Sequence, residues 1–360
     1  MNAVQRVIIR VDASVAMGMG HLARCVSLAN ALAQKGTSSI FLIRSHAAGL
    51  ASLIEANGHA VRLLPDPEHP AAVTSWLPTT WQYDAQQTLE MIGEIGPAQW
   101  LVVDHYGLDA RWEHMLRAGV PRILAIDDMA DRPHDCDLLL DQNLVAEMDT
   151  RYQGLVRANC RLLLGPRFAL LRPAFAALRR GLAARSGEVR RVLVCFGGSD
   201  PSNETVKALG AIQLLATVAL TIDVVIGASN PHVDAVSARC RELPGTELHR
   251  SVDNMAELMA RADLAIGAGG TMNWERCCLG LPTIAMDIAD NQVSGLTALA
   301  RAGALEYLGS AGSVGSVHIA RAVTALTREP ARMRAMSEAA FALVDGEGSD
   351  RVGTALGSIS

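Results

Sequence analysis

No stretch of the 360-residue chain approaches the ~18 consecutive apolar residues of a membrane span. The segment from Met1 to Asp12 holds only a short apolar run that Arg6 and Arg10 interrupt. Tandem repeats and low-complexity tracts are also lacking. Only 19% of the residues are charged and half are apolar, which excludes the composition of a disordered chain. These absences predict a globular, cytoplasmic protein with no membrane span.

Cysteine patterns of redox or metal sites are missing too. The seven cysteines are odd in number and contain no CxxC pair. Most lie in strongly apolar stretches, so we interpret them as buried free thiols in a reducing compartment. The formal net charge of -5 offers no long-range attraction for nucleic acid or an anionic membrane, so a nucleic-acid partner is not expected. Any anionic ligand must be held by local geometry.

The length predicts two domains, because a single hydrophobic core usually stops growing at about 250–300 residues. Short aliphatic runs alternate with amphipathic segments from end to end, which is typical of parallel sheets with crossover helices. Pro166 and Pro173 interrupt this rhythm. We therefore predict an α/β protein of the doubly wound class, with two Rossmann-like domains facing each other across a cleft: residues 1–170, a linker at 171–190, and residues 191–360 with a mainly helical end.

Each half opens with an apolar strand, a glycine-rich turn and a helix. Ligands of such sheets bind outside the carboxyl ends of the strands, so turns at 12–21, 104–107, 196–202 and 267–275 are predicted to line the cleft. The predicted strands are Arg6–Val11, Ser38–Ile43, Ala60–Leu64, Trp100–Asp104, Arg122–Ile126, Asp137–Leu140, Arg161–Leu164, Arg191–Phe196, Thr221–Ile226, Glu247–Arg250, Leu264–Ile266 and Thr283–Ala285.

The first turn, within Arg10–Arg24, contains two candidate features. Gly18, Gly20 and Ala23 match the GxGxxA spacing of dinucleotide-binding folds. That interpretation also needs an acidic residue after the second strand, and Arg44 stands there instead. A dinucleotide site is therefore disfavoured.

His21 is the second feature, because a helix start usually carries Ser, Thr, Asp or Gly rather than an imidazole. The positive end of a helix dipole favours the neutral imidazole, which is the form able to accept a proton. His21 is then either a general base or a histidine that only bonds the loop. Asp12 and Ser14 either orient it or end the strand.

The glycine-rich turn after residue 195 follows a clear strand and enters a helix. Gly197, Gly198 and Ser199 form either a diphosphate cradle or an ordinary tight turn. Asp200 is the predicted N-cap of the helix and Pro201 its first residue.

A further turn, Gly267–Pro282, also links a strand to a helix. Its glycines allow a ligand to approach the backbone closely. Thr271 and Asn273 could reach phosphate or sugar. Glu275 could accept both hydroxyls of a ribose, or lie on a solvated helix surface. A polar cluster after the next strand either faces the same cleft or caps a helix: Asp287, Asp290, Asn291 and Gln292.

Three polar residues, Asp104, His105 and Tyr106, end a buried-type strand where the cleft is predicted. His105 and Tyr106 are candidates for sugar contacts, while turn formation and a satisfied buried ring are the alternatives for Asp104 and His105. Asp135 and Asp137 show the DxD spacing of metal-dependent sugar transferases, and Asp127-Asp128 precedes them. A DxD pair is common by chance, so metal is the minor alternative.

The chain resembles the UDP-sugar hydrolases of pseudaminic acid biosynthesis, the PseG family, which are related to the MurG-like transferase of lipid II synthesis. The resemblance covers nearly the whole chain and rests on ordered motifs: the Arg10–Arg24 turn, Asp104-His-Tyr-Gly, Ile126-Asp-Asp, Gly165-Pro-Arg-Phe-Ala-Leu-Leu-Arg, Phe196-Gly-Gly-Ser-Asp-Pro, and Gly269-Gly-Thr through Cys278.

This resemblance implies a GT-B-type fold and hydrolysis of UDP-2,4-diacetamido-2,4,6-trideoxy-β-L-altropyranose to free sugar and UDP, without cofactor or metal. It implies His21 and Tyr106 as catalytic residues, with His21 activating water for inverting attack on the anomeric carbon. Met19 and Met272-Asn273 depart from the family pattern and leave the sugar open. We expect a monomer or weak homo-oligomer. Predicted substrate contacts are Arg10, Asp12, Gly18, Gly20, Asp104, His105, Asn291 and Gln292; predicted UDP contacts are Gly197, Gly198, Ser199, Gly269, Gly270, Thr271, Asn273 and Glu275.

Two rival functions stay open. One is a glycosyltransferase that uses an acceptor other than water, and the other is a non-catalytic UDP-sugar-binding protein. Fold alone does not choose among them.

Overall fold

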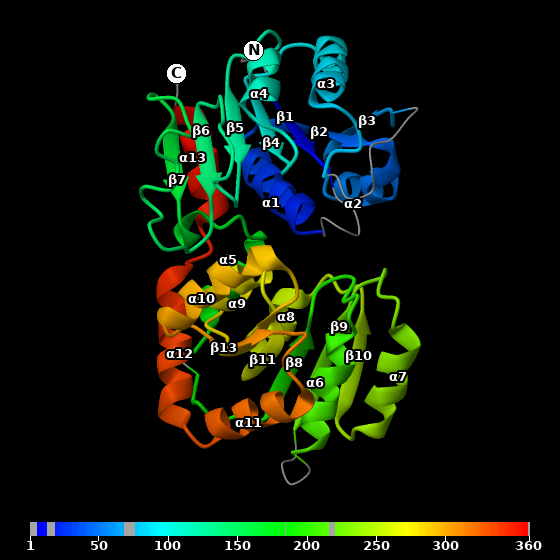
Figure 1. Ribbon diagram of the computed structural model, residues 1–360, viewed down its shortest axis with the longest axis vertical. Helices are drawn as coiled ribbons and strands as arrows, with labels where there is room; N and C mark the ends of the chain where they lie inside the picture. The colour runs from blue at the N-terminus through cyan, green and yellow to red at the C-terminus, as the bar shows by residue number, and fades with distance from the viewer. Residues whose placement is uncertain (1–5, 13–18, 68–75, 184, 216–219, 359–360) are drawn as a thin grey trace. The chain divides into compact units, whose positions relative to one another are not determined.

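A computed structural model describes residues 6–12, 19–67, 76–183, 185–215 and 220–358 of the protein (Figure 1). The contacts within the chain define two compact units. Unit 1 comprises Met1–Asn143, Glu147–Arg172 and Glu347–Ser360, and unit 2 comprises Leu144–Ala146 and Pro173–Gly346.

Unit 1 is built on a seven-stranded parallel sheet in the order β3-β2-β1-β4-β5-β6-β7. Its central strands are nearly continuous aliphatic runs, as expected for strands that are buried on both faces. The register pairs Val11 with Asp104 and Asp104 with Ile126, so β1, β4 and β5 end at the same edge. The strands are β1 Arg6–Val11, β2 Ser38–Arg44, β3 Ala60–Leu64, β4 Trp100–Asp104, β5 Ile123–Ile126, β6 Leu138–Asp141 and β7 Arg161–Leu164.

Helices cover both faces of this sheet. Alternate strand residues divide between two cores: Val7 and Ile9 pack with α1 and α13, while Ile8 packs with α3 and α4. The helices of unit 1 are α1 Gly20–Gln34, α2 Ala51–Ala56, α3 Trp81–Ile95, α4 Ala110–Leu116 and α13 Gly348–Ser358, with 3₁₀ turns η1 Ser45–Leu50 and η2 Pro166–Phe168.

The predicted boundaries of the second domain, residues 191–360, differ from the boundaries of unit 2. The last helix, α13, packs on α1 in unit 1, because its apolar residues Val352, Ala355 and Leu356 complete the core beneath that helix. Trp100 Nε1 also donates a hydrogen bond to the Leu356 carbonyl (3.0 Å). The predicted linker at 171–190 contains a helix, α5, whose Phe175 is buried and which packs on α8 and α9 of unit 2.

Unit 2 holds a six-stranded parallel sheet in the order β10-β9-β8-β11-β12-β13. Strand β13 was not predicted, because it is an edge strand whose residues are half-exposed and so lack an apolar pattern. The strands are β8 Arg191–Cys195, β9 Thr221–Ile226, β10 Thr246–Arg250, β11 Leu264–Ala268, β12 Thr283–Asp287 and β13 Glu306–Ser310.

The first helix of unit 2 after β8 starts later than predicted. It begins at Glu204 rather than Pro201, and its N-cap residue is Asn203 in the left-handed conformation (φ 58°). Asp200 still caps the helix, since its carboxylate accepts hydrogen bonds from the backbone N–H groups of Glu204 (2.8 Å) and Thr205 (2.9 Å). The helices are α5 Pro173–Gly181, α6 Glu204–Gln213, α7 Val233–Glu242, α8 Met255–Arg261, α9 Met272–Cys278, α10 Val293–Arg301, α11 Ser316–Thr327 and α12 Pro330–Leu343, with η3 Asp290–Gln292.

Each unit is therefore a parallel sheet covered by crossover helices, and the predicted α/β class with two Rossmann-like folds is confirmed. Within the described residues, every helix is too short or too polar to cross a lipid bilayer.

Candidate active site

Polar residues gather at the carboxyl edge of the unit 1 sheet. Asp12 directly follows β1, Asp104 ends β4, and Asp128 lies two residues after β5. Because these strands are parallel neighbours, their ends meet at one edge. The predicted residue Gly18 lies outside the described residues, and Gly20 is the first residue of α1. His21 is the next residue, so the helix start delivers it to this edge.

The imidazole of His21 is bound by Asp104. His21 Nδ1 lies 2.6 Å from Asp104 Oδ1, and both side chains are buried. The carboxylate can only accept, so Nδ1 carries the ring proton and its N–H donates a hydrogen bond to Asp104. The lone pair of the neutral ring is then on Nε2, the nitrogen able to take a proton from water. The sequence left Asp12 and Ser14 either to orient the ring or to end the strand. Ser14 lies outside the described residues, and the carboxylate that binds the ring is that of Asp104.

Arg24 holds the other side of Asp104. Its Nε and Nη2 donate to Oδ2 (2.6 Å) and Oδ1 (2.7 Å), which is a bidentate pair. Burial opposes ionisation of this carboxyl, but Arg24 and His21 outweigh it and hold the pKa of Asp104 below its usual value. Arg24 was not singled out from the sequence, although its spacing three residues after His21 places it on the same face of α1.

Tyr106 packs edge-on against His21. The ring centroids are 4.6 Å apart with an interplanar angle of 85°. Its hydroxyl donates to Asp128 Oδ2 (2.9 Å), and burial together with the Asp128 charge raises its pKa well above the ordinary value. On its other side Tyr106 meets Trp76, with centroids 5.2 Å apart. Tyr106 therefore lies at the predicted site, as a neutral phenol already bonded to a carboxylate.

The side chains of Arg10 and Asp12 lie in the interior, below the carboxyl edge of the unit 1 sheet. Both are almost fully buried, and they pair with each other at 2.7 Å. Arg10 also binds Asp84 at 2.8 Å, and Asp84 binds Arg44. We expected direct substrate contacts from Arg10 and Asp12. Their burial gives them a supporting role, because a charged network anchors the end of β1.

His105 is also buried. The backbone N–H of Gly107 donates to His105 Nδ1 (3.0 Å), so the ring proton is on Nε2, 3.5 Å from Asp12. His105 and Asp104 were predicted as substrate contacts. In the structure both bind protein groups: Asp104 binds His21 and Arg24, and His105 binds the backbone of the turn after β4.

The glycine turn after β8 is open in unit 2. A Cβ added to Gly197 or Gly198 would meet nothing within 4 Å, and Gly198 is exposed. Gly197 has a left-handed backbone (φ 96°), and Ser199 is half-buried. The backbone of this turn is thus uncrowded, which is what the close approach of an anion to backbone N–H groups requires.

The turn after β11 lies beside it, because Gly267 pairs with Cys195 in the sheet. Gly269 is crowded by Gln292, since an added Cβ would lie 2.9 Å from that side chain, and Gly270 has φ 96°. Gln292 Oε1 also accepts from the Ile288 N–H (3.1 Å). The predicted residues Gln292 and its exposed neighbour Asn291 thus lie in η3, with Gln292 against this turn.

Helix α9 follows this turn and carries the other predicted UDP contacts. Thr271 precedes the helix, and Glu275 is half-buried on it. Asn273 is buried and its Oδ1 accepts from Arg276 Nη2 (2.7 Å). Arg276, which sequence patterns did not single out, also donates to the Ala268 carbonyl (2.5 Å). Burial lowers its pKa. Arg276 thus anchors the turn from below.

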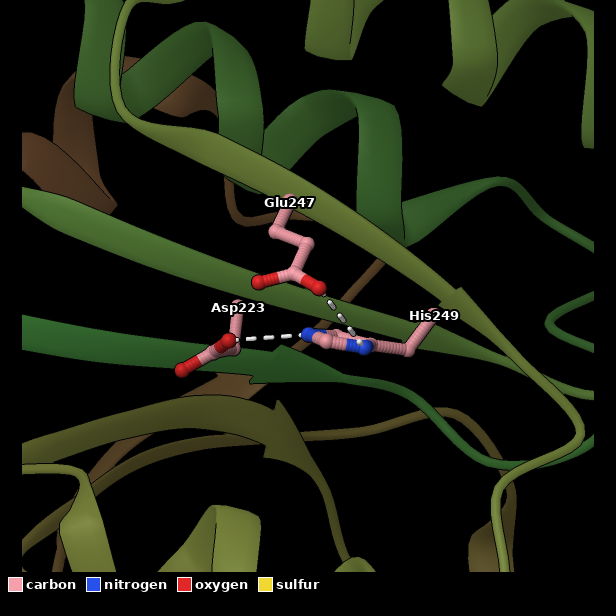
Figure 2. Close-up of side chains that lie close together, drawn as sticks. All are labelled: Asp223, Glu247 and His249. Carbon is pink, nitrogen blue, oxygen red and sulfur yellow. Dashed lines mark hydrogen bonds and ion pairs between the residues drawn. The ribbon is translucent and has the colours of Figure 1, made fainter.

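Figure 2 shows a cluster with metal-ligand residue types on β9 and β10: Asp223, Glu247 and His249. Asp223 accepts from His249 Nε2 (2.8 Å), and also from Arg191 (2.9 Å) and Arg261 (2.7 Å). Two guanidinium groups on the central carboxylate make this an ion-pair network. The DxD residues Asp135 and Asp137 are likewise bound by arginines, since each forms ion pairs with Arg117 and Arg157.

Three curated relatives are similar to this chain. It is 26% identical to an uncharacterised protein of Methanocaldococcus jannaschii over 78% of this chain and 55% of that one. It is 33% identical to the spore coat polysaccharide biosynthesis protein SpsG of Bacillus subtilis over 45% of this chain and 48% of that one. It is 25% identical to the UDP-2,4-diacetamido-2,4,6-trideoxy-β-L-altropyranose hydrolase of Campylobacter jejuni over 83% of this chain and 97% of that one. The chain spans about half the length of the first two.

Residues 240–292 match a family described as "Protein of unknown function (DUF354)". Among solved structures, MurG of Acinetobacter baumannii superposes with a TM-score of 0.69 at 13% identity, covering 99% of this chain and 100% of that one. A glycosyltransferase of kitacinnamycin superposes with a TM-score of 0.67 at 17% identity, covering 99% of each. These likenesses show a GT-B-type fold, as the sequence predicted.

Proposed function

We propose that the protein is a cytoplasmic hydrolase that cleaves a UDP-linked amino sugar at its anomeric carbon and releases free sugar and UDP. The observation that carries this proposal is the His21–Asp104 hydrogen bond of 2.6 Å at the carboxyl edge of a Rossmann-like sheet. The UDP-sugar hydrolase of Campylobacter jejuni, similar over most of the chain, supports the reaction class.

The proposed base is His21. In the reaction, Nε2 removes a proton from water while the water oxygen forms a bond to the anomeric carbon. Asp104 fixes the tautomer and stabilises the imidazolium that forms, which is the role of the aspartate in catalytic triads. Such general-base assistance typically contributes ~100- to 10,000-fold in rate. Attack opposite the departing UDP inverts the anomeric centre.

The leaving group needs no proton donor in this scheme. The bond between the anomeric carbon and the diphosphate oxygen breaks, and UDP departs as an anion with its electron pair. We assign its diphosphate to the turns around Gly198 and Gly270, where backbone N–H groups can bind the negative charge. Tyr106 is not assigned as an acid, since its hydroxyl proton is bonded to Asp128.

The substrate we propose is UDP-2,4-diacetamido-2,4,6-trideoxy-β-L-altropyranose, the compound in the name of the Campylobacter jejuni relative. The product sugar would then feed pseudaminic acid biosynthesis and the glycosylation of flagellin or other surface glycans. The role of the Bacillus subtilis relative in polysaccharide biosynthesis agrees with a place in surface-glycan chemistry.

A glycosyltransferase is the second candidate, favoured by the fold that the chain shares with MurG and the kitacinnamycin glycosyltransferase. The distinguishing experiment omits every acceptor and follows UDP and free sugar by NMR. Release of both at equal rates supports the hydrolase. Turnover that appears only after an acceptor is added supports the transferase. His21→Asn is expected to abolish release, and the matched control His114→Asn, which changes an exposed histidine on α4, is expected to retain it.

A further inference from the structure

Asp128 receives four hydrogen-bond donors at the edge of the unit 1 sheet. Oδ1 accepts from Arg24 Nη1 (2.9 Å) and from Asn143 Nδ2 (2.8 Å). Oδ2 lies 2.8 Å from Arg24 Nη2 and accepts from the Tyr106 hydroxyl (2.9 Å). Both oxygens are therefore committed to protein groups, and the side chain is only 16% exposed. Asp128 is bound too completely to act as an ordinary surface carboxylate.

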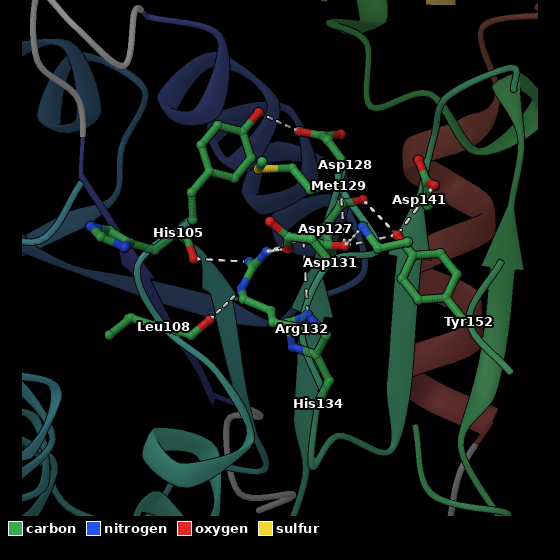
Figure 3. Close-up of polar contacts among 12 residues, drawn as sticks. His105, Leu108, Asp127, Asp128, Met129, Asp131, Arg132, His134, Asp141 and Tyr152 are labelled. Carbon is green, nitrogen blue, oxygen red and sulfur yellow. Dashed lines mark hydrogen bonds and ion pairs between the residues drawn. The ribbon is translucent and has the colours of Figure 1, made fainter. Parts of the chain in front are cut away.

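The backbone around Asp128 is fixed as well. Its neighbour Asp127 accepts hydrogen bonds from the N–H groups of Met129 (3.2 Å) and Ala130 (2.7 Å), which close the turn after β5. Figure 3 shows Asp127 turned toward Arg132 and Tyr152, and Asp128 turned away from them. The two adjacent carboxylates thus serve different sides of the strand end.

Two of the groups that Asp128 holds are the ones that contact the proposed base. Arg24 binds Asp104, the partner of His21, and Tyr106 packs against the His21 ring. Arg24 is clamped between two carboxylates, with bidentate contacts to Asp104 on one side and to Asp128 on the other. Loss of Asp128 would free both neighbours of the imidazole.

The charges of this group depend on Asp128. Arg24 alone would neutralise Asp104, so a proton arriving on His21 would meet no net negative charge. With Asp128 included, one guanidinium stands against two carboxylates, and protonation of His21 brings the sum to zero. Burial disfavours the charged form of Asp128, but Arg24 outweighs this and lowers its pKa, so the carboxylate is ionised at neutral pH.

We propose that Asp128 is a positioning residue for the reaction: it holds Arg24 and Tyr106 against His21 and supplies the negative charge that balances the imidazolium. This inference rests on the proposed function of His21. The titratable or charged groups that face Asp128 from the surrounding elements are His21 and Arg24 of α1, Asp104 of β4, Tyr106 after β4, Asp141 of β6, and Arg151.

Asp128→Asn tests the role of the charge. A hydrogen bond to a charged group is worth about 1.5–3 kcal/mol, so we expect kcat to fall ~10- to 100-fold, with a change in KM of less than about threefold. Removal of a negative charge disfavours the imidazolium, so the acidic limb of the kcat/KM profile is expected to move to lower pH. The matched control is Asp131→Asn in the same turn, a half-exposed carboxylate bonded to Arg132, and it should keep wild-type kinetics.

A readout without turnover separates this inference from the proposed function. A crystal structure of Asp128→Asn is expected to show the Arg24 guanidinium and the Tyr106 ring displaced from the positions that they hold beside Asp104 and His21. Should wild type hydrolyse no UDP-sugar, this displacement would still support the placement of Asp128, and only the proposed reaction would be wrong. Both side chains in their wild-type positions, together with wild-type kcat, would overturn the inference.

Asp128→Glu covers the case in which the asparagine variant does not fold. Glutamate keeps the charge but moves it by one methylene, so kcat is expected to fall while the acidic limb stays near its wild-type position. A glutamate variant with wild-type kcat would contradict the positioning role. If the acidic limb of the kcat/KM profile of Asp128→Glu moved to lower pH as far as the limb of Asp128→Asn, Asp128 would not act through its charge.

Discussion

Nδ1 of His21 lies 2.6 Å from Oδ1 of Asp104, although 83 positions separate the two residues in the chain. The parallel pairing of β1 with β4 produces this contact, because His21 lies in the first turn of the helix after β1 and Asp104 ends β4. The contact fixes which imidazole nitrogen carries the proton and which can act as a base. Asp104 is therefore expected to control turnover more than substrate affinity.

Asp104→Asn is expected to lower kcat by roughly 100- to 10,000-fold. The amide can offer a donor to Nδ1, which favours the wrong tautomer of His21. Steady-state kinetics with the UDP-sugar measures the effect, and circular dichroism checks the fold. Asp149→Asn, which alters an exposed carboxylate, is the control and should keep wild-type kcat. A folded Asp104→Asn enzyme with near-normal kcat would show that Asp104 does not orient the base.

Tyr106→Phe separates positioning from acid catalysis. The hydroxyl is bonded to Asp128, so its removal costs one hydrogen bond and leaves the ring against His21. A hydrogen bond to a charged group is worth about 1.5–3 kcal/mol, which predicts a roughly 10- to 100-fold fall in kcat. A loss beyond a thousandfold, measured at the pH optimum, would mean that Tyr106 transfers a proton in the reaction.

Gly198→Ala tests the proposed diphosphate site. An added Cβ would meet nothing within 4 Å, so the thermal unfolding temperature is expected to stay close to that of wild type. The methyl group would, however, stand where we place the diphosphate, and UDP affinity measured by calorimetry is expected to fall about tenfold or more, or by roughly 1.4 kcal/mol. Gly181→Ala, at an equally open position at the end of α5, is the control. Equal UDP affinity in Gly198→Ala and Gly181→Ala would mean that the diphosphate does not bind at the turn around Gly198.

The free energy of unfolding is expected to depend on pH through Asp141. Burial and the nearby charges of Asp128 and Asp127 outweigh the Asn143 N–H and Arg151, and raise the pKa of Asp141 to about 6. A carboxyl group with a raised folded-state pKa contributes stability that is full below its unfolded value of about 3.9 and is lost as pH rises through 6. Between pH 5 and pH 7 the free energy of unfolding is therefore expected to fall by ~1 kcal/mol relative to Asp141→Asn. Urea unfolding at pH 5, 6 and 7 measures the difference, and a difference independent of pH would contradict this account.

Local patterns predicted most strands and the places where the turns lie. Strand β4 was predicted with its observed bounds, since a fully buried parallel strand is a continuous apolar run. Edge strand β13 was missed because its half-exposed residues carry no such run. The place of α13 was missed because its apolar stripe does not specify which sheet it covers, and only the fold shows that it completes the core under α1.

The candidate site was predicted in part. His21, Asp104 and Tyr106 follow from their positions at strand and helix ends, where parallel sheets gather polar residues. The partners of these residues could not be predicted in this way. Arg24 binds Asp128, which lies 104 positions further along the chain, and no short-range spacing indicates that pairing. The burial of Arg10, Asp12 and His105 could not be predicted from the local sequence either. Charged and polar residues near a turn are usually exposed, and these side chains are buried only because they pair with groups of opposite charge.

The central claim is that His21 activates a water molecule that attacks the anomeric carbon. The most direct test incubates the protein with the diacetamido UDP-sugar in oxygen-18-labelled water, beside His21→Asn, and locates the label by mass spectrometry. The account predicts label in the free sugar, none in UDP, and no release by the variant. Label in the UDP phosphate, or release by His21→Asn at the wild-type rate, would contradict it.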